Sequence, residues 1–237
     1  MLFADRADAG RHLACRLTDR AADDVVVVGL PRGGVPVAYE VATALEAPLD
    51  IIIVRKLGVP SQPELGMGAI GEDGSRIIND AVVRLAHISP RVMEEVEQRE
   101  RAELGRRVRR FRGDRAAVPL KGRVVIVVDD GIATGSSAHT ACQVARAQGA
   151  RHVVLAVPVG PPDIQREFGP DADEIVCLHT PPDLSAIGEA YADFTQTSDE
   201  QVVELLASAS NPARGNTAGG HSGLRGQTGQ GRKWFAR

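Results

Sequence analysis

Aromatic residues and cysteines are scarce in this chain, and each shortage excludes something. Only 3% of the 237 residues are aromatic, so a core has to be built from Val, Ile, Leu and Ala. The three cysteines, Cys15, Cys142 and Cys177, are widely spaced and form no CxxC pair. This pattern excludes a disulfide framework and disfavours a zinc site, and it fits a reducing compartment. We therefore expect a cytoplasmic protein.

Long apolar runs and a secretory signal are also missing. No apolar stretch approaches the ~20 residues that a membrane-spanning helix requires. The first six residues, Met-Leu-Phe-Ala-Asp-Arg, do not begin an apolar signal core. We expect neither a membrane anchor nor secretion.

An excess of positive charge is absent from most of the chain. The formal net charge is -3, but residues 208–237 hold five basic side chains and no acidic one, which leaves residues 1–207 with a net charge of -8. An acidic body gives no basis for nucleic-acid binding, and no such partner is expected. The last 30 residues are rich in Gly, Ser, Asn and Thr, which predicts a flexible basic tail after a folded domain over residues 1–207.

Short apolar runs separated by helical patterns indicate an α/β fold. Runs that are apolar on both faces are typical of buried parallel strands. Helical spacing follows the first run at residues 35–45 and the third at 136–148. The sequence therefore predicts a central parallel sheet of about five strands flanked by helices. The expected strands are residues 25–30, 50–55, 121–129, 152–158 and 174–178.

A segment of different character lies between the second and third expected strands. Residues 66–78 are glycine-rich and predict a small hairpin, and Ser89-Pro90 predicts the start of a long helix. Pairs spaced i,i+4, such as Glu103 and Arg107, favour a solvated helix face over a nucleic-acid patch for the arginines late in that helix. We expect a small subdomain inserted at about residues 58–115.

Two adjacent acids end the third expected strand and carry the main functional signal. Asp129 and Asp130 are followed by small residues and by the start of the next helix, whose backbone N–H groups form an anion cradle. Carboxylates beside a phosphate repel it unless a neutral group separates them. A sugar does so, because its hydroxyls donate to the acids while its phosphate lies on the amides. The spacing therefore predicts a site for a phosphorylated ribose.

The run Val125–Ser137 resembles the signature of type I phosphoribosyltransferases, in which apolar residues precede two acids and a Thr-Gly turn. The GxxxxGK pattern of a P-loop is absent. The resemblance covers about residues 25–194. It implies the fold of that family with a small hood, phosphoribosyl pyrophosphate (PRPP) as donor, Mg²⁺ as cofactor, and commonly a homodimer. It places the ribose hydroxyls on Asp129 and Asp130, which also become candidate Mg²⁺ ligands. It places the 5′-phosphate on Ala133, Thr134, Gly135, Ser136 and Ser137.

Two further stretches fit the pyrophosphate side of such a site. Leu30-Pro-Arg-Gly-Gly34 occupies the place of the family's pyrophosphate loop, where Arg32 and Gly33 are candidate ligands, and a cis Arg32–Gly33 peptide is expected. Arg55 and Lys56 end the second expected strand, and Lys56 is one of only three lysines. We interpret both as pyrophosphate ligands; for Lys56 the alternative is a surface charge pair.

The acceptor is less well defined. Ala133 stands where the hypoxanthine–guanine branch of the family has an aspartate, so the motif is more similar to the adenine-type branch. Glu64, in a glycine- and proline-rich segment that would form a lid, is a candidate base, and an exposed loop acid is the alternative. The hood is expected from residues 66–78 and the region after the fifth strand. Tyr191 and Phe194 are candidates to stack on an acceptor ring, with Asp193 accepting from it, or else they pack against the terminal helix.

The reaction implied is transfer of the 5-phosphoribosyl group from PRPP to a nitrogen of a nucleobase-like acceptor, with release of pyrophosphate. This would make the protein an Mg²⁺-dependent glycosyltransferase of nucleotide metabolism. The motif indicates donor binding more strongly than catalysis. The alternative is therefore a non-catalytic regulator that senses PRPP on the same fold.

Overall fold

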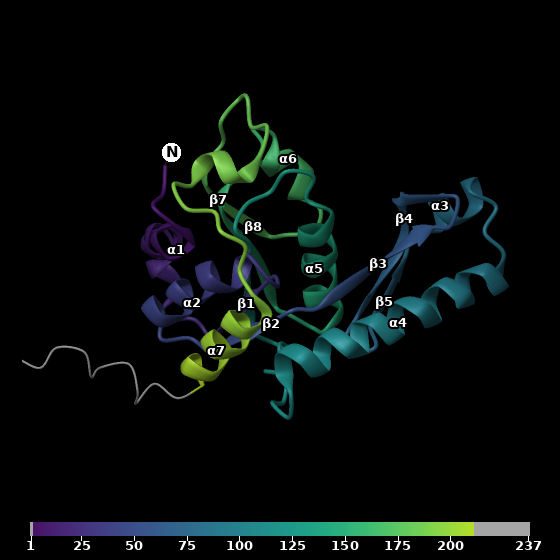
Figure 1. Cartoon of the computed structure of the whole chain (residues 1–237), viewed down its shortest axis with the longest axis horizontal. Coiled ribbons are helices and arrows are strands. Elements are labelled where there is room, and N and C mark those ends of the chain that lie inside the picture. Colours follow the sequence, from purple (N-terminus) through teal and green to yellow (C-terminus); the bar gives the residue numbers. More distant parts are fainter. Residues whose placement is uncertain (1, 211–237) are drawn as a thin grey trace, which may run out of the picture.

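Five parallel strands form the main sheet of the chain, in the order β2-β1-β6-β7-β8 (Figure 1). The computed structural model describes residues 2–210, so most of the predicted tail lies outside the described residues. The parallel α/β architecture expected from the apolar runs is confirmed. The strands are β1 Val25–Gly29, β2 Leu49–Ile51, β6 Val124–Val128, β7 His152–Val159 and β8 Glu174–His179.

The order of the strands places the functional loops. From β1 the chain moves outward to β2, and it returns on the other side of β1 with β6. This reversal makes the carboxyl ends of β1 and β6 the switch point, where open α/β sheets bind ligands. Gly29 and Val128 are register partners at these ends. The residues that follow each strand, 30–34 and 129–137, are therefore neighbours in space.

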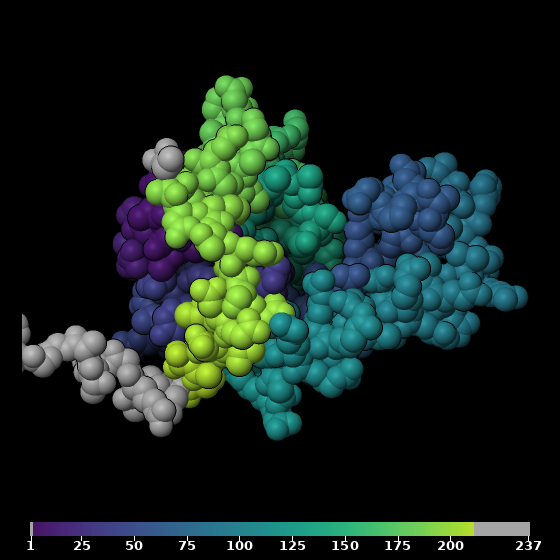
Figure 2. All heavy atoms as spheres, viewed as in Figure 1, coloured from purple at the N-terminus to yellow at the C-terminus, as the bar shows by residue number. Residues whose placement is uncertain are grey.

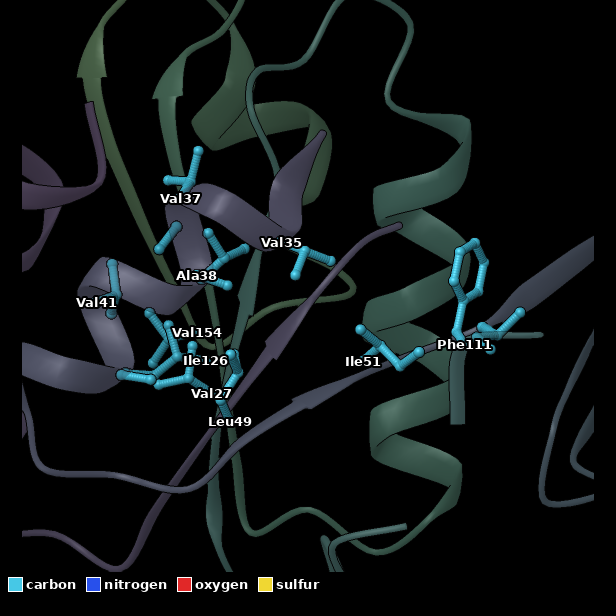
Figure 3. Close-up of a cluster of buried hydrophobic side chains, with 14 of the residues drawn as sticks. Val27, Val35, Val37, Ala38, Val41, Leu49, Ile51, Phe111, Ile126 and Val154 are labelled. Atoms are coloured by element: carbon cyan, nitrogen blue, oxygen red, sulfur yellow. The ribbon is translucent and has the colours of Figure 1, made fainter. Parts of the chain in front are cut away.

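Helices cover both faces of the sheet. On one face lie α1 Arg6–Cys15, α2 Gly34–Ala44 and α7 Asp199–Ala209, and on the other lie α5 Ser136–Ala147 and α6 Ile164–Phe168. Short 3-10 turns are η1 Thr18–Arg20 and η2 Ile187–Ala190. The side chains of β6 alternate between the two cores, which are largely aliphatic, as the shortage of aromatics requires. Figure 3 shows Val27, Ile126 and Val154 of neighbouring strands packing beneath α2.

The expected strand over residues 50–55 is wrong as a single element. The main sheet keeps only β2, which ends at Ile51. The next strand, β3 Val54–Val59, belongs to a second, antiparallel sheet. Ile52 and Ile53 are buried at the crossing between the sheets, with 2% and 3% of their surface exposed. An unbroken apolar run cannot show where a buried chain leaves a sheet, because burial is the same on both sides of the crossing.

Residues 54–112 form an arm that projects from the main sheet (Figures 1 and 2). Its sheet consists of β3, β4 Gln62–Gly71 and β5 Arg76–Ile78, followed by α3 Asp80–Leu85 and the long α4 Pro90–Arg112. The hairpin and the long helix predicted from the sequence are thus confirmed, and the Ser89 hydroxyl caps α4 by accepting from the Val92 amide at 3.3 Å. The antiparallel subdomain starts four residues before the expected boundary. Its role as a hood or lid stays a prediction.

Arg112 fastens the C-terminal end of the arm to the main sheet. Its guanidinium contacts Asp50 Oδ1 at 2.5 Å, the carbonyl oxygen of Ile51 at 2.8 Å and Glu72 Oε2 at 2.6 Å. Burial opposes the charge of this group, but Glu72 and Asp50 outweigh that effect and raise the pKa of Arg112. The last residue of α4 is therefore held at the edge strand from which the arm departs.

The terminal helix extends slightly beyond the expected domain end. A capping box between Ser198 and Gln201 starts α7, which continues to Ala209. The helix thus ends two residues beyond position 207, and the domain boundary itself stays a prediction. Within residues 2–210, no helix combines the length and the apolar character that crossing a membrane requires.

Candidate functional site

The two acids after β6 lie directly against the glycine loop after β1. A Cβ added to Gly33 would overlap the Asp130 carboxylate, and one added to Gly34 would lie 2.6 Å from the carbonyl oxygen of Val128. Only residues without a side chain let the two loops approach so closely. The ribose and pyrophosphate elements predicted separately from the sequence are therefore in contact.

The cis peptide expected in this loop is displaced by one bond. The cis bond joins Pro31 to Arg32, whereas the sequence favoured the bond between Arg32 and Gly33. The order of residues in so short a loop does not show which of its peptide bonds is cis.

The acid pair is electrostatically unfavourable when ionised. Burial, and then the negative charge of Asp130, raise the pKa of Asp129 well above its usual value. Asp129 Oδ1 accepts a hydrogen bond from the Asp130 amide at 2.9 Å. The site is therefore suited to bind a group that donates hydrogen bonds or carries positive charge, such as a sugar hydroxyl or a cation.

Arg6 at the start of α1 supplies a counter-charge that was not predicted from the sequence. Its Nε and Nη2 atoms each lie 2.8 Å from Asp130 Oδ2, and its Nη1 donates to the carbonyl oxygen of Thr195 at 2.7 Å. The ion pair is largely shielded, with 11% and 12% of the two side chains exposed. Asp130 is 124 positions away from Arg6, and no motif surrounds the arginine, so no local signal could have revealed the pair.

We predict that Arg6→Gln destabilises the fold most strongly at neutral pH. Removing one partner of a shielded ion pair costs about 2–4 kcal/mol. Arg6 also opposes the raised pKa of Asp129, so the variant raises that pKa further. A carboxyl with a raised pKa in the folded state carries its penalty above that pKa and loses it as the pH falls. The deficit in the free energy of unfolding should therefore shrink towards acidic pH in urea titrations. A pH-independent deficit would contradict this account.

The phosphate cradle begins at a left-handed glycine. Gly135 has φ +68°, and a Cβ there would lie 2.5 Å from the Phe168 ring, so the turn into α5 requires glycine. Ala133, Thr134, Ser136 and Ser137 are all exposed. The first amides of α5 have no carbonyl partner within the helix and carry its positive dipole end. All five residues predicted for the 5′-phosphate are therefore grouped at the carboxyl edge of the sheet.

Lys56 and Glu64 lie opposite this cradle. They line a cavity of about 720 Å³ between the arm and α5, together with Thr134 and Ser136. The Lys56 ammonium group donates to the backbone carbonyl of Glu64, and both side chains belong to strands of the arm. The structure thus brings these two predicted residues to the 5′-phosphate side of the site.

Arg55 is engaged elsewhere. Its guanidinium pairs with Glu100 of α4 at 2.6 Å, and the pair joins β3 to the long helix. Burial acts to raise the pKa of Glu100, but hydrogen bonds from Arg55 and Arg99 outweigh it and lower that pKa. The pair gives Arg55 a structural contact, and a part for Arg55 in pyrophosphate binding stays a prediction.

Arg32 opens onto a different cavity, of about 810 Å³. Its Nη1 atom lies 3.5 Å from Asp199 Oδ1 at the start of α7, and 39% of its side chain is exposed. All arginines of α4 except the buried Arg112 are exposed, in keeping with their sequence pattern, and three of them line this cavity with Arg32. They are Arg106, Arg107 and Arg110.

The aromatic residues after β8 support the acid pair. Tyr191 is 3% exposed, and its hydroxyl donates to the carbonyl oxygen of Asp130 at 2.6 Å. Burial, and then the charge of Asp130, raise its pKa. Phe194 stacks on Tyr191, while the Arg6 guanidinium lies 3.9 Å from the centroid of the Phe194 ring. Asp193 accepts two hydrogen bonds from Thr195, which lower its pKa. Tyr191 is therefore a packing residue, and acceptor contacts of Phe194 and Asp193 stay predictions.

Comparison with known proteins agrees with this geometry. The family model described as "Phosphoribosyl transferase domain" matches residues 3–192. Two Mycobacterium tuberculosis proteins, named "Putative phosphoribosyl transferase MT0597" (strain CDC 1551) and "Putative phosphoribosyl transferase Rv0571c" (strain H37Rv), are 60% identical over 205 residues. That alignment covers 86% of this chain but 46% of each relative, so the chain spans about half the length of the curated relatives it matches.

A solved structure extends the similarity to three dimensions. The crystal structure of TT1426 from Thermus thermophilus is 41% identical and superposes with a TM-score of 0.80. The match covers 87% of this chain and 98% of that chain. This chain therefore shares its architecture with nearly the whole length of that solved relative.

Proposed function

The chain belongs to the phosphoribosyl transferase domain family, and we propose that it moves the 5-phosphoribosyl group of PRPP to a nitrogen of a nucleobase-like acceptor. The observation that carries the proposal is the meeting of the acid pair, the glycine loop and the α5 cradle at one switch point. A ligand with two hydroxyls between two phosphate groups satisfies all three at once.

In this transfer the acceptor nitrogen is the nucleophile, so the protein mainly has to position the donor and the acceptor. The lone pair of the acceptor nitrogen forms the bond to the anomeric carbon as the bond from that carbon to the pyrophosphate oxygen breaks, and pyrophosphate keeps the electron pair. Asp129 and Asp130 would fix the ribose, and the α5 amides would fix its 5′-phosphate, so the reacting carbon is held in place. The nitrogen loses its proton to a base, for which Glu64, facing the cradle across its cavity, is our candidate.

The residues present fit Mg²⁺. Adjacent carboxylates supply the hard oxygen atoms that this ion prefers, and it usually takes its other ligands from water and substrate phosphates. Within the described part of the chain, no group of three or more His, Cys, Asp or Glu residues is placed to hold a metal ion. Asp129 and Asp130 would hold it, and when bound it would offset charge on the leaving pyrophosphate.

Turnover of PRPP with a panel of acceptors tests the proposal. Purified protein, PRPP and Mg²⁺ are incubated with each purine or pyrimidine base, and both pyrophosphate and the nucleotide product are measured. We expect pyrophosphate release that depends on one class of acceptor, with a low rate in its absence. Tight PRPP binding without turnover on any acceptor would favour the PRPP-sensing regulator. Absence of PRPP binding would overturn both functions.

A further inference from the structure

One side chain of the N-terminal helix holds the second acid of the site. The Arg6 guanidinium lies 2.8 Å from Asp130 Oδ2 through both Nε and Nη2, and its Nη1 donates to the carbonyl oxygen of Thr195 at 2.7 Å. The guanidinium carbon lies 3.9 Å from the centroid of the Phe194 ring. A planar guanidinium with partners on two edges and one face is held in a single orientation. Arg6 is therefore fixed before any ligand binds.

Backbone pairing between distant segments places Arg6 at the site. The Ala192 amide donates to the carbonyl oxygen of Phe3 at 2.8 Å. The Asp193 amide donates to the carbonyl oxygen of Ala4, also at 2.8 Å. Arg6 follows this pairing by two residues and begins α1. The backbone that carries Arg6 is thus bonded to the segment whose Thr195 carbonyl receives its side chain, so the fold itself sets the position of the guanidinium.

The two acids differ in how firmly they are held. Asp130 is held at its carboxylate by Arg6 and at its carbonyl oxygen by the Tyr191 hydroxyl, at 2.6 Å. Both contacts from Arg6 go to Oδ2, and no donor within residues 2–210 bonds to Asp130 Oδ1. The Asp129 carboxylate accepts one hydrogen bond from the described residues, which comes from the Asp130 amide. Asp130 therefore has one oxygen left to accept, in a direction that Arg6 sets.

We propose that Arg6 is a positioning residue that gives this chain selectivity for a hydroxylated over a deoxygenated donor sugar. The inference rests on the proposed function, since it assumes that Asp130 accepts a hydrogen bond from one ribose hydroxyl. A hydroxyl gains most from an acceptor that is charged and already oriented, because binding then incurs little further loss of freedom. Arg6 supplies that orientation without touching the sugar. It is bonded to Asp130 and not to Asp129, so a hydroxyl on Asp129 is recognised without its help.

Ratios of affinity for sugars with and without each hydroxyl test this role. Ribose 5-phosphate, 2-deoxyribose 5-phosphate and 3-deoxyribose 5-phosphate are titrated into the full chain by calorimetry, with MgCl₂ held constant. In the parent, loss of either hydroxyl should weaken binding by about 10-fold. In Arg6→Gln, one of the two ratios should fall to about 2-fold while the other stays unchanged. A ratio of two affinities does not depend on the fraction of folded protein, so instability of the variant cannot imitate this result.

Further variants separate positioning from charge and from general effects. Asp130→Asn should lower the same ratio, and Arg6→Gln/Asp130→Asn should lower it no further, because Arg6 acts through Asp130. Arg6→Lys keeps the charge without the planar fork, so it should also show the lower ratio. Arg11→Gln is the matched control, since Arg11 is an exposed arginine of α1 that pairs with Asp8 at 3.3 Å. Both of its ratios should equal those of the parent.

The outcomes distinguish failure of this inference from failure of the proposed function. If Arg6→Gln or Arg6→Lys keeps both parental ratios, or if Arg11→Gln lowers one of them equally, the inference is wrong and the proposed function stands. If the parent chain does not bind ribose 5-phosphate, or binds all three sugars equally, the proposed function is overturned and the inference with it.

Discussion

Asp129→Asn should cripple donor binding and at the same time stabilise the folded protein. The variant loses hydrogen bonds from a ribose hydroxyl to a charged acceptor and a ligand for the cation, so PRPP affinity measured by calorimetry should fall by about 100-fold. The side-chain carbonyl oxygen of the introduced asparagine can still accept from the Asp130 amide, and the ion pair between Arg6 and Asp130 is untouched. What disappears is a half-buried negative charge beside a second, buried one.

The gain in stability should depend on pH. Burial and Asp130 raise the pKa of Asp129, so the folded parent carries a penalty when this acid is ionised. The penalty is full above the raised pKa and is lost as the pH falls below it. At neutral pH the variant should gain about 1–2 kcal/mol in free energy of unfolding, and at acidic pH the two curves should converge.

The neighbouring acid provides the contrast. Asp130→Asn should also weaken PRPP binding, but it leaves Arg6 shielded and without its carboxylate partner, so it should lower the stability. A gain of stability for Asp129→Asn and a loss for Asp130→Asn would confirm that Arg6 pairs with Asp130 and not with Asp129. If both variants lost stability equally, the assignment of Arg6 to Asp130 alone would be wrong.

Gly34→Ala should strongly destabilise the folded protein. The added Cβ would lie 2.6 Å from the carbonyl oxygen of Val128 and 2.8 Å from the Asp129 Cα, and both atoms belong to the backbone. Neither a side-chain rotation nor a small shift relieves such contacts, so we expect a loss of about 2–4 kcal/mol and loss of PRPP binding. Urea midpoints at an unchanged m-value measure the first, and calorimetry measures the second.

Gly105→Ala is the matched control for that substitution. Gly105 lies within α4, where the nearest atom to a new Cβ is Arg109 Nη1 at 3.5 Å. Alanine inside a helix is favoured over glycine by about 0.5–1 kcal/mol, so this variant should be as stable as the parent or more stable. Equal behaviour of the two variants would show that the two loops are not packed against each other as described.

The donor side of the site was predictable because its signals are local. The glycines at 33 and 34 closely follow β1, and the two acids directly follow β6. Parallel strands bring their carboxyl ends to one edge, so placing both strands in one parallel sheet was enough to predict that the segments meet. The convergence required no knowledge of side-chain packing.

Contacts between distant segments could not be predicted in the same way. Nothing near Arg6 or Asp130 indicates that they pair, and nothing near Arg55 indicates that it faces Glu100 across 45 positions. Such pairs depend on the angle between elements, which no sequence pattern sets. The arginines of α4 show the same limit, because the helical pattern correctly predicts exposed side chains but not the cavity that they face.

The aromatic residues illustrate a further limit. Position late in the chain made Tyr191 a candidate to contact an acceptor, yet its hydroxyl supports the backbone of Asp130. A tyrosine suits either place, since it combines an apolar ring with a polar tip. Sequence pattern alone does not distinguish a ring that faces a ligand from one that holds the loop behind it.

Because Arg112 binds to β2, the arm begins and ends at the same edge strand of the main sheet. The backbone leaves β2 after Ile51. Some sixty residues later, the side chain of Arg112 binds the Asp50 carboxylate and the carbonyl oxygen of Ile51. Since both ends of the arm lie at β2, the number of residues in the arm does not affect the register of the five parallel strands. The arm can therefore vary in length and sequence during evolution without changing the fold of the main sheet.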